Sequence, residues 1–162
     1  MTAPGLRVGH GIDAHRFVPR RPFMLGGVLI PYDRGLMGHS DGDSVAHALA
    51  DACLGAAGLG DMGRHFPSTD PQWKDVAGVA LLERVADKLA DANWQVISAH
   101  VVAVAEEPRL QAHLGAMSEA LCGALRVAPG TVVVGATTTD GMGFAGRGDG
   151  VAASAMVLLA PL

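Results

Sequence analysis

The chain has 162 residues, and its 12 basic and 16 acidic side chains give a formal net charge of −4. This length is typical of one domain, which would span residues 1–162. A hydrophobic content of 49% excludes a disordered chain, and the lack of an excess of basic residues argues against nucleic acid as a partner. Cys53 and Cys122 lack C-x-x-C spacing, and neither an N-terminal apolar leader nor an apolar run of about 18 residues occurs, which predicts a cytoplasmic protein without a membrane segment.

The pattern of apolar and turn residues predicts strands and helices that follow one another without an internal repeat or a linker. In chain order they are a strand over residues 6–15, a basic loop over 16–22, two short strands within 23–32 hinged at Gly26-Gly27, a helix from Asp43 to the Gly-rich segment 55–63, a turn-rich segment over 61–71, a helix over 75–93, a strand over 94–105, a helix from Pro108 to Arg126, a strand over 131–139, a Gly-rich loop over 140–150 and a strand over 151–160. This order is typical of an α+β domain with a mixed β-sheet and helices on one face. The other face then needs a cover, for which oligomerisation is the simplest solution.

The stretch from His39 to His47 concentrates polar chemistry in a chain with 17% charged residues. It reads His-Ser-Asp-Gly-Asp-Ser-Val-Ala-His, and Ser40 and Asp41 are N-cap candidates for the helix that follows. Ser40-x-x-Asp43 also resembles a capping box with Asp in place of Glu. Free backbone N–H groups at a helix start attract anions. His39 and Ser40 therefore either bind a phosphate group or belong to a simple helix cap.

Asp13, His15 and His47 form the candidate metal site. Asp13 and His15 share one face of the first strand, and three protein ligands with one open position are typical of catalytic zinc. Ligating imidazoles are usually oriented by a carboxylate, and Asp43 or Asp51, on the same helix face as His47, could serve. The alternative is that these side chains are unrelated surface or hydrogen-bonded residues. The other histidines have no further candidate ligand at a suitable spacing and are expected to be structural or solvent-facing. They are His10, His65, His100 and His113.

The Gly-rich loop after the strand over 131–139 contains Gly141-x-Gly143-x-x-Gly146, which matches the dinucleotide fingerprint. No helix pattern follows it, and the chain ends before the acidic residue expected about 20 positions later, so a Rossmann site is rejected. What remains is Asp140, a candidate magnesium ligand, and Arg147, a fixed cation. A plain hairpin loop is the alternative.

Five motifs occur in one order: Gly9-His-Gly-Ile-Asp-Ala-His, His39-Ser-Asp-Gly-Asp-x-x-x-His47, Leu59-Gly-Asp-Met-Gly, Phe66-Pro-x-Thr-Asp and Ala136-Thr-Thr-Thr followed by Gly-Phe-x-Gly-Arg-Gly-x-Gly. Together they resemble the 2-C-methyl-D-erythritol 2,4-cyclodiphosphate synthase family of the non-mevalonate isoprenoid pathway. The resemblance covers residues 6–160.

The resemblance implies a cytoplasmic homotrimer whose sheets pack around a central channel, with active sites at the subunit interfaces. It implies a phosphorus-oxygen lyase, in which the 2-phosphate of 4-diphosphocytidyl-2-C-methyl-D-erythritol 2-phosphate attacks the β-phosphorus and expels CMP. Asp13, His15 and His47 would bind one Zn²⁺ per subunit, and Asp140 would hold Mg²⁺ or Mn²⁺ with the substrate diphosphate. His39 and Thr138 would stabilise the transition state.

The resemblance also implies a set of substrate-binding residues, in three groups. Around the metal and the methylerythritol phosphate end they are Asp13, Ala14, His15, His39, Ser40, Asp61, Met62, Gly63, Phe66, Pro67, Ser68, Thr69 and Asp70. Around the cytidine diphosphate end they are Ala105, Glu106, Glu107, Pro108, Arg109, Leu110, Gln111, Thr137, Thr138, Thr139 and Asp140. Phe144 and Arg147 match further substrate positions.

The sequence departs from the family pattern where Asp140 replaces a frequent Glu, Ser68 a common Asp, and Gly141 and Arg109 a frequent Lys. None of these changes removes a zinc ligand. Two other functions remain open. One is a zinc-dependent phosphohydrolase that releases a linear product, and the other is a non-catalytic trimeric module that captures isoprenoid diphosphates in a channel near Arg147 and Asp149.

Overall fold

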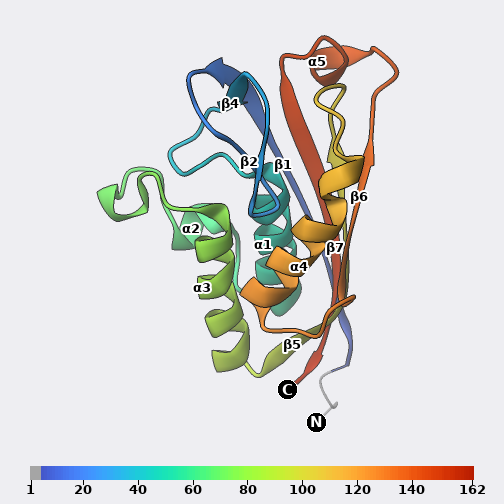
Figure 1. The fold of residues 1–162 in the computed structure, drawn as a ribbon. Helices are drawn as coiled ribbons and strands as arrows, with labels where there is room; N and C mark the ends of the chain where they lie inside the picture. Colours follow the sequence, from blue (N-terminus) through green and yellow to red (C-terminus); the bar gives the residue numbers. More distant parts are fainter. Residues whose placement is uncertain (1–4) are drawn as a thin grey trace.

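The computed structural model describes residues 5–162 and consists of a β-sheet layer and a helical layer (Figure 1). The expectation of an N-terminus without an apolar leader falls partly on residues 1–4 and lies outside the described residues. The strands are β1 (Arg7–Pro19), β2 (Phe23–Leu25), β3 (Val28–Ile30), β4 (Arg34–Leu36), β5 (Trp94–Val104), β6 (Val132–Thr137) and β7 (Gly150–Pro161). The helices are α1 (Ser44–Ala57), α2 (Met62–His65), α3 (Gly78–Asp91), α4 (Leu114–Leu125) and α5 (Gly143–Gly146), with short 3₁₀ helices η1 (Pro71–Trp73) and η2 (Gln111–His113).

The main sheet has the strand order β4-β1-β7-β5-β6, and β2 and β3 form a separate hairpin. All neighbours in the main sheet are antiparallel except β5 and β6, which are parallel. The mixed α+β sheet expected from the sequence is therefore confirmed.

The helices α1, α3 and α4 cover one face of the sheet, as Figure 1 shows. Along β1 the glycines Gly9 and Gly11 are buried under α1, whereas Val8 and Ile12, which point the other way, are each 65% exposed. Met156 on β7 is likewise 55% exposed. The prediction of helices on one face and an uncovered opposite face is confirmed. We call the uncovered side the open face.

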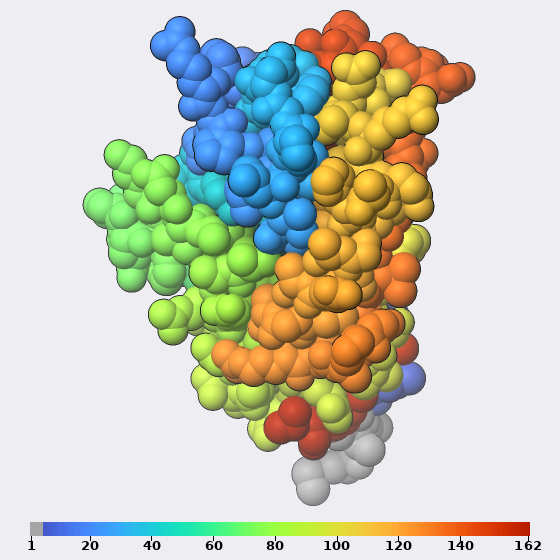
Figure 2. Space-filling model, in the orientation of Figure 1, coloured from blue at the N-terminus to red at the C-terminus, as the bar shows by residue number. Residues whose placement is uncertain are grey.

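The helix side of the molecule presents a continuous surface. In Figure 2 the atoms of α3 (green), α4 (orange) and the β2–β3 segment (blue) adjoin one another on this side. The core between this layer and the sheet is filled by small and branched apolar side chains, among them Leu49, Leu82 and Leu121, all fully buried. None of the helices within residues 5–162 has the length and apolarity that a membrane span requires.

Several predicted boundaries were wrong. Residues 16–19 are not a loop, because Phe17, Val18 and Pro19 continue β1 by pairing with β4, a strand that was not predicted. The segment over 61–71 is not turns throughout, since it contains α2. The last long helix begins at Leu114 rather than at Pro108: residues 108–110 lie outside helices and strands and line a cavity beside 136–138, and residues 111–113 form η2.

Candidate functional site

The first helix approaches the first strand unusually closely because β1 presents glycines to it. A Cβ added at Gly11 would lie 2.1 Å from the carbonyl oxygen of Ala48, and one at Gly9 would lie 2.0 Å from that of Ala52. No side chain larger than hydrogen fits there. Asp13 and His15 follow at the same two-residue period, so their side chains point to the same side as the glycines and meet the first turns of α1.

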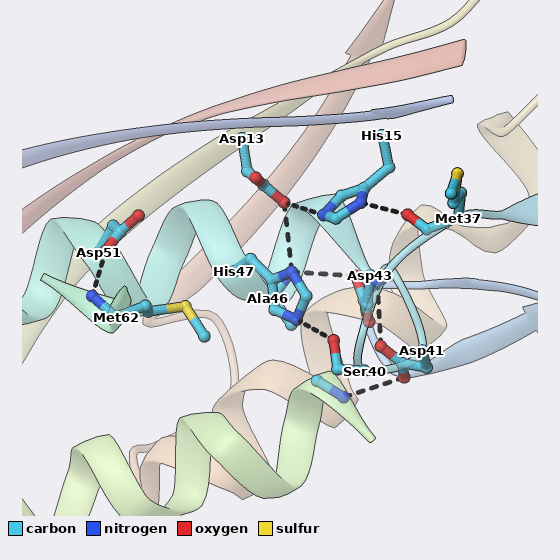
Figure 3. Close-up of polar contacts among 12 residues, drawn as sticks. Asp13, His15, Met37, Ser40, Asp41, Asp43, Ala46, His47, Asp51 and Met62 are labelled. Carbon is cyan, nitrogen blue, oxygen red and sulfur yellow. Dashed lines mark hydrogen bonds and ion pairs between the residues drawn. The ribbon is translucent and has the colours of Figure 1, made fainter. Parts of the chain in front are cut away.

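Asp13, His15 and His47 meet where β1 and the start of α1 come together (Figure 3). The Asp13 Oδ2 atom lies 2.8 Å from His15 Nε2 and 3.2 Å from His47 Nδ1. One potential ligand atom from each of the three side chains lies within 4.8 Å of the other two. The structure thus brings together the three residues that the sequence proposed as one site.

The outer nitrogens of both imidazoles have partners that face away from this cluster. His15 Nδ1 lies within hydrogen-bonding distance of the Met37 carbonyl oxygen, and His47 Nε2 lies 3.1 Å from the Ser40 hydroxyl oxygen (Figure 3). These contacts fix which nitrogen each ring turns toward the cluster, which is how proteins orient metal-binding histidines. The prediction that Asp43 or Asp51 orients the rings by direct contact was wrong.

Asp43 is fully buried and holds backbone N–H groups instead. Its carboxylate accepts hydrogen bonds from Gly26 N at 2.8 Å, Gly27 N at 2.7 Å and Ala46 N at 3.0 Å. It is therefore the N-cap of α1, in place of the predicted Ser40 or Asp41, and it also fixes the turn of the β2–β3 hairpin.

The other two carboxylates near the cluster also bind backbone. Asp41 accepts from Gly78 N at 2.9 Å and so satisfies the first turn of α3, whose own N-cap residue Ala77 has no capping side chain. Asp51 accepts from Met62 N at 2.8 Å and connects α1 to the start of α2. Burial raises the pKa of the Asp51 carboxyl.

The charges of the cluster support one another. Burial opposes ionisation of Asp13, but hydrogen bonds with His15 and His47 and their charge outweigh it and lower the pKa of Asp13 from 3.8 to about 2. Burial also disfavours the charged form of His15, yet the hydrogen bond to Asp13 and its charge raise the pKa of His15 above 6.5. Asp13 is therefore an anionic oxygen donor at neutral pH, beside two imidazole nitrogens. One carboxylate and two oriented imidazoles are a donor set that suits Zn²⁺.

A cavity of about 240 Å³ surrounds this cluster. Its walls combine the cluster with residues of the loop before α1, of α1 and α2, of the segment from α2 through η1, and of α3. They are Asp13, His15, His39, Ser40, His47, Asp51, Met62, Phe66, Ser68, Trp73 and Leu81. Met62, Phe66 and Ser68, which were predicted for the methylerythritol phosphate end, thus line the same cavity as the three predicted metal ligands.

The remaining residues predicted for the methylerythritol phosphate end lie in the same segment, where they cap or connect the short helices α2 and η1. Asp61 caps α2 and Gly63 lies within α2. Pro67 and Thr69 lie in the connection to η1, and Asp70 caps η1. The Asp70 carbonyl oxygen also lies 3.1 Å from His39 Nε2, so the 66–70 segment and the His39 side chain are in direct contact.

A second cavity, of about 400 Å³, lies at the ends of β5 and β6 and is lined by Ala105, Glu106, Pro108, Arg109, Leu110, Gln111, Ala136, Thr137 and Thr138. Glu106 joins its two walls, since its Oε1 atom accepts from Thr139 N and Gly141 N, each at 3.0 Å. Within the described part of the chain no residue lines both this cavity and the one around Asp13. Most of the residues predicted for the cytidine diphosphate end thus line one cavity, separate from the cavity around the metal cluster of the same chain, whereas Glu107, Thr139 and Asp140 do not line it.

Three further predicted residues lie elsewhere. Asp140 is exposed in the loop after β6 and is not among the side chains that converge on Asp13. Phe144 and Arg147 line a third cavity, of about 610 Å³, together with residues 14–17 of β1, which include His15, with Arg34 of β4 and with residues 148–150. Arg147 forms an ion pair with Asp149 at 3.0 Å.

Sequence reasoning missed Arg21, which donates hydrogen bonds to the carbonyls of Gly38 and Ser40 beside the site. No local signal could have identified it, because its partners lie 17 and 19 residues later in the chain, in an irregular loop that follows β4.

Comparison with known proteins shows the family to which the chain belongs. The model of the YgbB family matches residues 6–160. The 2-C-methyl-D-erythritol 2,4-cyclodiphosphate synthase of Moorella thermoacetica is 50% identical over 154 residues, which cover 95% of this chain and 94% of the relative.

Two solved structures have the same fold. The bifunctional IspDF of Campylobacter jejuni superposes with a TM-score of 0.93 at 38% identity, over 97% of this chain and 42% of that one. A CDP-bound 2C-methyl-D-erythritol-2,4-cyclodiphosphate synthase superposes with a TM-score of 0.86 at 35% identity, over 95% of this chain and all of that one. The family indicated by the five sequence motifs is confirmed. The chain belongs to the YgbB family, whose relatives named above are 2-C-methyl-D-erythritol 2,4-cyclodiphosphate synthases.

Proposed function

We propose that the protein converts 4-diphosphocytidyl-2-C-methyl-D-erythritol 2-phosphate to 2-C-methyl-D-erythritol 2,4-cyclodiphosphate and CMP, as a cytoplasmic phosphorus-oxygen lyase of isoprenoid precursor biosynthesis. The observation that carries the proposal is the Asp13, His15 and His47 cluster, which opens into the same cavity as His39 and Ser40. It does so in a chain whose relatives bear the name of this enzyme.

The reaction needs no protein nucleophile. An oxygen of the 2-phosphate forms a bond to the β-phosphorus, the bond from that phosphorus to the oxygen bridging it to the α-phosphate breaks, and CMP leaves with the electron pair. Both reacting groups are anions, so positioning and charge neutralisation account for most of the catalysis.

In this proposal Asp13, His15 and His47 hold one Zn²⁺ per subunit, and Asp140 holds Mg²⁺ or Mn²⁺ together with the substrate diphosphate. The bound cations supply positive charge that lowers the repulsion between the two phosphates. His39 and Thr138 lie against the reacting groups and stabilise the charge that develops on them.

The cavity around Asp13 receives the methylerythritol phosphate end, and the cavity lined by Glu106 and Thr137 receives the cytidine diphosphate end. The CDP-bound relative supports a cytidine nucleotide as part of the substrate. Because the two cavities are separate within one chain, a complete site requires a neighbouring subunit. The homotrimer of this proposal buries the open face, whose exposed apolar side chains include Val8, Ile12 and Met156.

The same assembly places the cavity beside Arg147 near the central channel. Arg16 and Arg34 also line it, so three guanidinium groups stand beside one carboxylate, that of Asp149, and this excess of positive charge favours an anionic occupant such as an isoprenoid diphosphate.

The test is to incubate the purified protein with the CDP-linked substrate, Zn²⁺ and Mg²⁺, and to follow CMP release and the phosphorus NMR spectrum of the product. We expect stoichiometric CMP and a cyclic diphosphate, and native mass spectrometry should show a trimer. CMP with a linear product would instead identify a phosphohydrolase. Absence of turnover, with retained isoprenoid diphosphate binding, would identify a binding module.

A further inference from the structure

Arg21 lies in the connection between β1 and β2 and reaches the loop that carries His39 and Ser40. Its Nη1 atom donates to the Gly38 carbonyl oxygen at 3.0 Å, and its Nη2 atom donates to the Ser40 carbonyl oxygen. The two acceptors flank His39. One guanidinium group therefore spans the backbone on both sides of this residue.

Residues 37–40 lie outside helices and strands, yet all four of their carbonyl groups have a hydrogen-bond partner. The Met37 carbonyl faces His15 Nδ1, and the His39 carbonyl accepts from Asp75 N at 2.8 Å. The carbonyls of Gly38 and Ser40 both depend on Arg21. Loss of the guanidinium group would leave half of the loop's carbonyls without their protein donor.

The backbone that carries the Arg21 side chain is closely packed. A Cβ added at Gly35 of β4 would lie 2.4 Å from the Arg21 carbonyl oxygen and 2.3 Å from that of Pro22, so the backbone at 21–22 is packed directly against the strand. The Arg21 side chain is half-buried. Arg21 therefore holds the loop of residues 37–40 at a defined position relative to β4.

The loop places two side chains of the site. His39 lines the cavity around Asp13 and contacts the Asp70 carbonyl, while the Ser40 hydroxyl lies 3.1 Å from His47 Nε2. A shift of the backbone at 38–40 would therefore move His39 relative to the substrate and release the His47 ring from its partner. We propose that Arg21 is a positioning residue for the reaction, acting through His39 and Ser40 without touching the substrate. This inference rests on the proposed function.

The experiment compares Arg21→Ala, Arg21→Lys and the control Arg20→Ala in the zinc-loaded full-length protein. Arg20 is the exposed neighbour, so its replacement removes the same charge from the same connection. We expect Arg21→Ala to lower kcat by about 10- to 100-fold, because displacement of a catalytic group by about 1 Å has effects of this size, with KM changed less than kcat. Arg21→Lys keeps the charge but not the two-pronged geometry, and should recover kcat only in part.

A second readout does not depend on turnover. The ring Cε1–H signals of His39 and His47, observed by NMR with carbon-13-labelled histidine, should shift or broaden in both Arg21 variants and stay unchanged in Arg20→Ala. If Arg21→Ala does not fold, Arg21→Lys carries the test. Wild-type kcat together with unchanged ring signals in Arg21→Lys, or equal effects of the Arg21 and Arg20 replacements, would overturn the inference.

Wild-type turnover separates this inference from the proposed function. If the wild type forms no cyclic product, the proposed function fails, and the histidine signals alone then decide whether Arg21 fixes the loop. If the wild type forms the product and the Arg21 variants match it in kcat and in ring signals, only the role of Arg21 fails.

Discussion

Replacement of Gly11 by alanine should damage the metal site through the position of α1. The new Cβ would lie 2.1 Å from the Ala48 carbonyl oxygen and 2.7 Å from Ala52 N, both backbone atoms that cannot rotate away. To restore a contact of 3.4 Å the helix must retreat by about 1.3 Å. His47 precedes Ala48, so its Nδ1 atom, now 3.2 Å from Asp13 Oδ2, would move with the helix.

We expect Gly11→Ala to lose about 1–3 kcal/mol of unfolding free energy through overpacking. Because metal sites require ligand distances within about 0.2 Å, its zinc affinity should fall by about 100-fold or more. Urea unfolding of the metal-free protein at fixed concentration and competition for zinc with a chromophoric chelator measure the two effects.

The matched control is Gly55→Ala, in the same helix, where an added Cβ would meet no atom within 4 Å. It should stabilise the protein by about 0.5–1 kcal/mol, the usual gain for Gly to Ala within a helix, and leave zinc affinity unchanged. If Gly11→Ala keeps wild-type zinc affinity, the account of the site through close packing of α1 on β1 is refuted.

Three other changes test single contacts. Ser40→Ala removes the hydroxyl partner of His47 and should weaken zinc binding by about 10- to 100-fold in the same competition assay, and an unchanged affinity would contradict the orienting role of that hydroxyl. Asp43→Asn replaces one carboxylate oxygen by an NH2 group, which cannot accept a hydrogen bond, so at least one of the three backbone N–H groups loses its acceptor. Urea unfolding should then show a loss of about 1–3 kcal/mol of unfolding free energy, whereas a loss below about 0.5 kcal/mol would contradict the role of Asp43 as an acceptor for these groups. Hydrogen bonds from the 139–141 backbone hold the pKa of Glu106 below 4.5, so its contacts persist above pH 4.5 and are lost as the pH falls through the lowered pKa. The amide NMR shifts of 139–141 should titrate there, and the absence of this titration would contradict the Glu106 contact.

The sequence predicted the elements of the fold well where periodicity was strong. The helix over 75–93 matches α3 because its apolar residues recur with a helical period, and the strand over 94–105 matches β5 because it is rich in valine, although it alternates only loosely. β4 was missed because three residues containing a glycine carry no period. Its existence, and the extension of β1 to Pro19, follow from tertiary pairing between Phe17 and Leu36.

The pairing of Asp13 with His15 was predictable because side chains two residues apart on a strand share a face. That His47 meets them was indicated by its ligand chemistry and by the family motifs, since this contact joins residues 34 positions apart. The partners of the rings were not predictable. A carboxylate such as Asp43 was the natural candidate, but it is used for three backbone N–H groups, and a backbone carbonyl and a hydroxyl orient the rings in its place. Backbone carbonyls carry no sequence signature.

The strand β1 serves two surfaces at once. Asp13 and His15 face α1, while Ala14 and Ile12 between and before them face the open side of the sheet. Because strand side chains alternate strictly, deletion or insertion of one residue before Asp13 would exchange the two sets, exposing the carboxylate and imidazole and driving isoleucine against the helix. The candidate metal site and the open face therefore depend on the same alternation of side chains, so a change in the length of this strand would disrupt both.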